Sequence, residues 1–103
     1  MDVIFHSHNA VISEPLRSRA ESVIRKLESR SARAVRAIVR FEQDGPTRRV
    51  EIEMHASRRR PLISNGYGRT YGAALSEAVH NLQAQLARSK RTPKARARAT
   101  VQP

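Results

Sequence analysis

A cluster of cations near the end of the chain has the chemistry needed to bind phosphate. Arg88, Lys90 and Arg91 stand within four residues, at the end of a segment whose apolar residues recur at helical spacing. A guanidinium can hold a phosphate through two parallel hydrogen bonds, and a helix gives such contacts a rigid support. Cations also interact favourably with the C-terminal end of a helix, and charged surface side chains are usually just solvated. The spacing therefore indicates a phosphate-binding surface, with stabilisation of the helix end as the alternative.

Two further features could contact nucleic acid. The run Arg58-Arg59-Arg60 stands before Pro61 in a basic connection, where it could add affinity for phosphate without specificity. Tyr67 stands between two glycines, and an aromatic ring on such a loop could stack on a base. A tyrosine that covers the core at a turn is the more common case, and the sequence favours that interpretation.

The remaining polar residues do not indicate catalysis or a metal site. His6 and His8 share one side of an extended segment, but the chain has no Cys and no third ligand at a suitable spacing. Glu51 and Glu53 also share a face, where flanking arginines favour ion pairs over acid–base catalysis. The sequence contains no P-loop, dinucleotide-binding fingerprint or nucleophile elbow. We therefore expect a protein that is not an enzyme and that holds no cofactor or metal.

Net charge is the strongest feature of the composition. The 103-residue chain carries twenty Lys and Arg against nine Asp and Glu, which gives a formal charge of +11. Coding bias can explain why most of these cations are Arg, but it does not explain the excess of positive charge. A domain this basic favours a polyanion such as RNA, and an acidic protein is the alternative partner. The longest apolar run is Val3-Ile4-Phe5 and no secretory signal is visible, so we expect a cytoplasmic protein without membrane contact.

Alternating and helical periods predict six elements within one domain. Strands are predicted over residues 2–8, 34–42, 48–56 and 62–66. Helices are predicted from the N-cap Ser13 to about residue 30, and from the N-cap Thr70 to residue 91. Gly66-Tyr67-Gly68 is expected to break the chain before the second helix. Residues 92–103 lack an apolar period and are predicted to form a flexible basic tail, which leaves 1–91 as the folded domain.

This order of elements, β-α-β-β-β-α, predicts an α+β fold with a four-stranded sheet and both helices packed on one face. The first strand, helix and second strand form a right-handed crossover, and the second helix has a single apolar stripe that needs the same face. Alternation turns Val35, Ala37, Val39 and Phe41 toward the core. On the uncovered face it predicts a row of mixed charge that favours cross-strand pairs over a docking surface. This row consists of Arg36, Arg40, Arg49, Glu51 and Glu53.

The order and spacing of several short segments resemble a known family. The segments are Asn9 through Arg17, Lys26-Leu27-Glu28, the alternating hairpin, Tyr71-Gly72-Ala73-Ala74-Leu75, and Gln85-Leu86 before Arg88-Ser89-Lys90. From about Val3 to Lys94 the chain is similar to the short form of the ribosome hibernation-promoting factor and ribosome-associated inhibitor family, also called the sigma-54 modulation protein family. It departs from the family pattern at Ser76 and at His80-Asn81, where members usually carry charged residues. The middle of the second helix is therefore nearly uncharged.

The resemblance implies a role at the ribosome. Members of the family bind the 30S subunit, alone or within the 70S ribosome, in the channel that holds messenger and transfer RNA, and they stop translation under stress or in stationary phase. Another hibernation factor is a possible further partner. At matching positions the resemblance implies contacts with 16S rRNA by Arg17, Lys26, Arg88, Lys90 and Lys94, and residue chemistry adds their neighbours Arg25 and Arg91. The alternatives are a general binder of double-stranded or structured RNA, and a basic protein-interaction or regulatory module.

Overall fold

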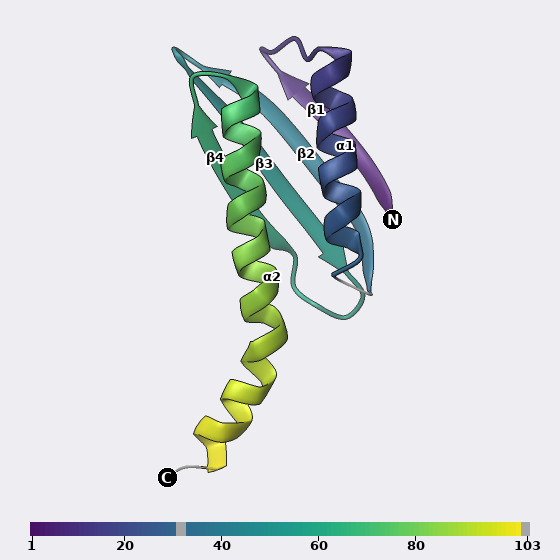
Figure 1. The fold of residues 1–103 in the computed structure, drawn as a ribbon, viewed down its shortest axis with the longest axis vertical. Helices are drawn as coiled ribbons and strands as arrows, with labels where there is room; N and C mark the ends of the chain where they lie inside the picture. Colours follow the sequence, from purple (N-terminus) through teal and green to yellow (C-terminus); the bar gives the residue numbers. More distant parts are fainter. Residues whose placement is uncertain (31–32, 102–103) are drawn as a thin grey trace.

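The computed structural model shows a four-stranded sheet with two helices on one of its faces (Figure 1). It describes residues 1–30 and 33–101, with side chains to residue 88. The elements are β1 (Asp2–His8), α1 (Glu14–Glu28), β2 (Ala34–Asp44), β3 (Thr47–Ala56), β4 (Leu62–Gly68) and α2 (Tyr71–Val101). The strand order is β1-β2-β3-β4, with β1 and β2 parallel and the other pairs antiparallel. The predicted α+β fold and element order are confirmed.

Local sequence signals determine where α1 begins and which side it buries. The backbone N–H of Leu16 donates to the hydroxyl of Ser13 at 3.3 Å, so Ser13 is the N-cap as predicted. Apolar residues spaced four and three apart then point toward the sheet, and Ala20, Ile24 and Leu27 are buried. Because β1 leads into α1 and α1 into the parallel strand β2, this helix covers the β1–β2 side of the sheet (Figure 1).

The core lies between the sheet and the helices. Alternate residues of β2 and β3 are buried on this side, and they meet the apolar stripe of α2. The buried strand residues are Ala37, Val39, Phe41, Val50, Ile52 and Met54. The prediction that Val35 points inward is wrong, because its side chain is 51% exposed. The register between β2 and β3 shifts between Ala34 and Arg36, so Val35 lies at a bulge that interrupts the alternation.

The strand predicted to end at Gly66 continues through Tyr67 and Gly68, so the prediction that Gly66-Tyr67-Gly68 breaks the chain is wrong. β4 continues to Gly68, and α2 begins three residues later. A Cβ atom on Gly66 would lie only 1.9 Å from the carbonyl oxygen of Ala74, so glycine lets α2 pack directly on the strand backbone. Tyr67 points to the opposite side, where it pairs in register with Arg49 and is 52% exposed. Tyr67 is therefore an exposed strand residue and not a turn residue that covers the core.

Side chains of α2 also seal the outer edge of β4. The amides of Asn81 and Gln85 donate to the backbone carbonyls of Asn65 and Ile63, at 2.9 and 2.8 Å. One turn earlier, a carboxylate oxygen of Glu77 accepts a hydrogen bond from a backbone N–H of β4. An edge strand with unpaired backbone groups invites pairing with another chain. These three side chains of α2 therefore bond to part of that edge and fix the helix along β4.

The second helix is longer than the sequence predicts. α2 continues without a break through Val101, past the expected end near Arg91. Residues 94–100 consist of Lys, Arg, Ala and Thr, of which the first three have high helix propensity. The flexibility predicted for residues 92–103 stays a prediction. In the part of the chain that the structure describes, neither helix is long and apolar enough to cross a membrane.

Candidate nucleic-acid interface

The uncovered face of the sheet carries a network of ion pairs, as the mixed row of charges predicts. The guanidinium of Arg40 lies 2.8 Å from a carboxylate oxygen of Glu51 and 3.0 Å from one of Glu53. Arg49 extends the network to the other oxygen of Glu51, at 3.0 Å, and to Glu42 at 3.4 Å. Cross-strand pairs of this kind stabilise a sheet. Arg40 and Arg49 are thereby engaged by carboxylates of the same face.

The electrostatics of this network do not suit acid–base catalysis. The hydrogen bond from His55, and then that from Arg40, lower the pKa of Glu53 below its ordinary value. The hydrogen bond that Arg40 donates to Glu53 is in turn the main cause that raises the pKa of Arg40. A carboxylate held ionised in this way cannot serve as a general acid near neutral pH. Glu53 is therefore a structural partner of Arg40, and Glu51 pairs with Arg40 and Arg49 in the same network.

The charges of the chain are distributed unequally between the two sides of the sheet. By strand alternation, the uncovered face holds three of the twenty cations, Arg36, Arg40 and Arg49. The same alternation gives this face five of the nine carboxylates, which are Asp2, Glu42, Asp44, Glu51 and Glu53. Seventeen cations and four carboxylates remain for the helices, the connections and the strand residues on the helix side. The excess of positive charge therefore lies away from the uncovered face.

Several predicted contact residues come together at one end of the molecule. Arg25 and Lys26 belong to the last turn of α1, and Arg58–Arg60 to the connection between β3 and β4. The two helices run in the same direction, and the end of α1, the β3–β4 connection and the outgoing part of α2 lie toward the same end (Figure 1). Arg88 lies in this outgoing part and is exposed. Three basic segments, distant in sequence, thus share one end.

The other predicted residues are placed differently. Arg17 lies in the first turns of α1, toward the opposite end, and its guanidinium carbon is 5.1 Å from the centre of the Phe5 ring. This cation–π contact holds the side chain in place, and no carboxylate pairs with it among the described residues. The side chains of Lys90, Arg91 and Lys94 lie outside the described residues.

Arg25 and Lys26 differ although they are neighbours in one turn of α1. The guanidinium of Arg25 lies 3.3 Å from Glu21 and 3.9 Å from Glu28, and it donates to the carbonyl oxygen of Met1. Lys26 is exposed, and within the described ranges no ion pair involves it. A phosphate would have to displace carboxylates from Arg25 but not from Lys26. The geometry therefore favours Lys26 as a contact over Arg25.

A family model matches almost the whole chain. It is the model of the sigma 54 modulation protein / S30EA ribosomal protein family, and it matches residues 3–94. This chain belongs to that family. The resemblance that the sequence suggests is confirmed, and membership of this ribosome-associated, non-enzymatic family supports association with the ribosome.

Solved structures share the fold of this S30EA-family chain. A ribosomal subunit interface protein from Coxiella burnetii is 14% identical, with a TM-score of 0.81 over 87% of this chain and 98% of its own. The N-terminal domain of Protein Y from Thermus thermophilus is 21% identical, with a TM-score of 0.75 over 85% of this chain and 98% of its own. At these identities the likeness shows the fold alone. No curated protein sequence matches the chain significantly.

The structure gives roles to the uncharged residues at which this S30EA-family chain departs from the family pattern. The hydroxyl of Ser76 accepts a hydrogen bond of 2.8 Å from the guanidinium of Arg19, which ties α2 to α1. Asn81 holds the edge of β4, as described above. Sequence reasoning missed Arg19, because its partner lies 57 residues away and no local pattern links the two. His6 and His8 join no group of three or more potential metal ligands among the described residues.

Proposed function

We propose that this domain binds the small ribosomal subunit in the channel for messenger and transfer RNA and stops translation by occupying it. It does so in the cytoplasm and without chemistry of its own. The observation that carries this proposal is the unequal distribution of charge on an S30EA-family fold. Carboxylates gather on the uncovered sheet face and engage Arg40 and Arg49, so most of the cations available to an RNA lie on the helix side and at the ends. RNA phosphates are the partner that such a surface fits.

Recognition would depend on shape and phosphate more than on sequence. Structured RNA is recognised mainly through its backbone and shape, and this surface offers cations on rigid helices. Arg17, Lys26 and Arg88 contribute from α1 and α2, with Lys90, Arg91 and Lys94 farther along α2. Arg58–Arg60 add affinity with little specificity. Each phosphate contact releases counterions, so binding through several such contacts weakens as the salt concentration rises. With about six to ten contacts, the affinity should fall by on the order of a thousandfold or more between 50 and 200 mM salt.

Co-sedimentation with purified 30S subunits at two salt concentrations tests the proposal. Charge reversal at Arg88, Lys90 and Arg91 should abolish binding, and Lys26→Glu should weaken it and reduce the salt dependence. Arg36→Glu is the matched control for Lys26→Glu, because it makes the same change of charge on the opposite side of the molecule. It should bind as the unaltered protein does. Equal losses for Lys26→Glu and Arg36→Glu would show that only total charge matters and would contradict the proposal.

A translation assay with purified components tests the second half of the proposal. The unaltered protein should inhibit synthesis in proportion to the fraction of subunits that it occupies. The charge-reversed protein should not inhibit. Failure of 30S subunits to retain the unaltered protein at low salt would refute the proposed function. If duplex RNA competes as well as whole subunits do, the protein is a general RNA binder.

A further inference from the structure

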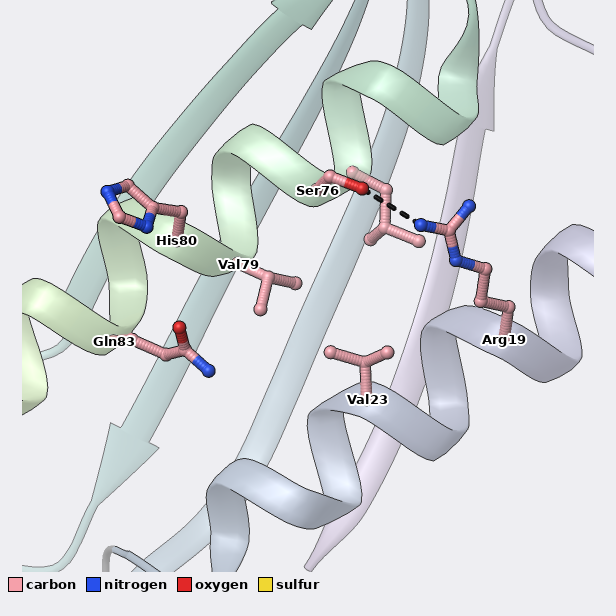
Figure 2. A pocket seen from close by; sticks show the side chains of 7 residues that line it. Arg19, Val23, Ser76, Val79, His80 and Gln83 are labelled. Atoms are coloured by element: carbon pink, nitrogen blue, oxygen red, sulfur yellow. Dashed lines mark hydrogen bonds between the residues drawn. The ribbon is translucent and has the colours of Figure 1, made fainter.

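A pocket opens between α1 and α2, on the side of the molecule that carries the excess of positive charge. Figure 2 shows Val23 of α1 and Val79 of α2 facing one another across it, with the hydrogen bond between Arg19 and Ser76 at one end. Leu75 completes the apolar part of the lining. The volume is about 210 Å³. A cavity of about 150 Å³ can hold a benzene ring, so the space is sufficient for one planar heterocycle.

Polar groups surround this apolar lining. Gln83 lies toward the end away from the Arg19–Ser76 bridge, and His80 lies three residues before it, at the outer side of α2 (Figure 2). Arg19 is held in place, since its guanidinium bonds to Ser76 and packs against Gly72, where a Cβ atom would lie 3.2 Å from it. A guanidinium has five N–H donors, so Arg19 can still donate to a ligand while it bonds to Ser76. The pocket thus combines an apolar interior with a rim of hydrogen-bonding groups, as ligand sites commonly do.

No carboxylate lines the pocket, although the two helices carry four. Glu77 is turned toward β4, where it accepts from the backbone N–H of Tyr67. Glu21 and Glu28 are engaged by Arg25 on another side of α1. Glu14 lies in the first turn of α1 and is not part of the lining. An anionic polymer can therefore approach the pocket without meeting a negative charge at its rim.

We propose that the pocket between α1 and α2 receives one unpaired base of the bound RNA. A base has apolar faces and a hydrogen-bonding edge, which match the valines and the rim of Arg19, Gln83 and His80. A phosphate would make no favourable contact with the apolar interior, and an aliphatic side chain would form no hydrogen bonds with the polar rim. RNA-binding proteins commonly recognise unpaired bases that are splayed out of the helix. The inference rests on the proposed RNA docking and adds one base contact to its phosphate contacts.

Plugging the pocket from either wall tests the inference without changing any charge. Val23→Phe fills it from α1, and Gln83→Phe fills it from α2. Each should weaken binding to purified 30S subunits by roughly tenfold or more, which corresponds to the loss of one base contact. The salt dependence should stay unchanged because the number of phosphate contacts is the same. Thermal unfolding of each variant checks the fold, and two plugs from opposite walls guard against a local defect.

Chemical probing of the RNA identifies the occupant. With the unaltered protein, one base should lose reactivity at its hydrogen-bonding edge, and both plugs should restore that reactivity. Ala84→Phe is the matched control, because it adds the same ring at an exposed position of α2 outside the pocket. It should bind and protect as the unaltered protein does.

Three results would overturn the inference while leaving the proposed function intact. The first is that the plugged proteins bind as tightly as the unaltered one. The second is that Ala84→Phe weakens binding as much as the plugs do. The third is that the plugs weaken binding but change the reactivity of no base, which would mean that a protein side chain occupies the pocket. If the unaltered protein does not bind 30S subunits at all, the proposed function fails and this inference fails with it.

Discussion

Removal of the Arg40 side chain should lower the stability of the domain and leave its binding to the ribosome unchanged. Its guanidinium donates to Glu51 and Glu53 at 2.8 and 3.0 Å, across two strands of the uncovered face. The side chain is 42% exposed, so each pair is worth less than a buried one, about 0.5–1 kcal/mol. Arg40→Met keeps most of the aliphatic stem but leaves two neighbouring carboxylates without their shared cation. We expect a loss of about 1–2 kcal/mol, or roughly 5–10 °C in melting temperature.

The loss of stability in Arg40→Met should become smaller at low pH. The folded protein holds the pKa of Glu53 below its ordinary value of 4.5, through the hydrogen bonds from His55 and then Arg40. A carboxyl group with a lowered pKa stabilises the folded state above its ordinary pKa, and this contribution disappears as the pH falls through the lowered value. The difference in melting temperature between the unaltered protein and Arg40→Met should therefore be full at pH 7. It should shrink as the pH falls below about 4.5.

Thermal unfolding followed by circular dichroism, together with 30S binding at 20 °C, measures both effects. Arg36→Met is the control, because it removes a cation from the same face and strand, and no ion pair involves Arg36 among the described residues. It should change the melting temperature by much less. Binding to 30S subunits should persist in both variants. The reasoning would be refuted if Arg40→Met melted like the unaltered protein, or if it lost ribosome binding at a temperature where it is folded.

Three further variants test the packing of α2. Replacement of both Asn81 and Gln85 by Ala should lower stability by about 1 kcal/mol for each lost hydrogen bond, and should increase self-association by light scattering through the opened edge of β4. Gly66→Ala should destabilise the domain by about 3 kcal/mol or more in urea unfolding, because the methyl group would meet the backbone of the helix. Tyr71→Phe should leave stability unchanged or raise it by about 1 kcal/mol in the same assay. The reason is that the buried Tyr71 hydroxyl has no hydrogen-bond partner among the described residues.

Periodicity predicted the elements because each depends on residues close in sequence. The alternation in β2 and β3 and the apolar stripes of α1 and α2 gave the order of elements and the covered face. The failures arose where contacts between distant segments decide the structure. Gly66 marks the close approach of α2 to the strand backbone and not a chain break, and Val35 is exposed because the register with β3 shifts beside it. Neither cause is visible in the local sequence.

The candidate site was predictable only in part for the same reason. Clusters such as Arg58–Arg60 are visible in the sequence, and the fold brings them to the end where α1 stops (Figure 1). The bridge from Arg19 to Ser76, and the pocket beside it, depend on two helices more than fifty residues apart. The engagement of Arg25 by Glu21 could have been found, since the two are four residues apart on a predicted helix.

Folding and RNA binding compete for the same cations in a chain of this composition. Nine carboxylates cannot neutralise twenty Lys and Arg, so an excess of positive charge exists wherever the carboxylates are absent. An arginine with a carboxylate within hydrogen-bonding distance offers less to a phosphate, because the phosphate must first displace that carboxylate. The positions of the carboxylates therefore determine where an RNA can bind. Five of them lie on the uncovered sheet face and two more hold Arg25, which leaves Arg17 and Lys26 as the cations of α1 best placed to meet a phosphate.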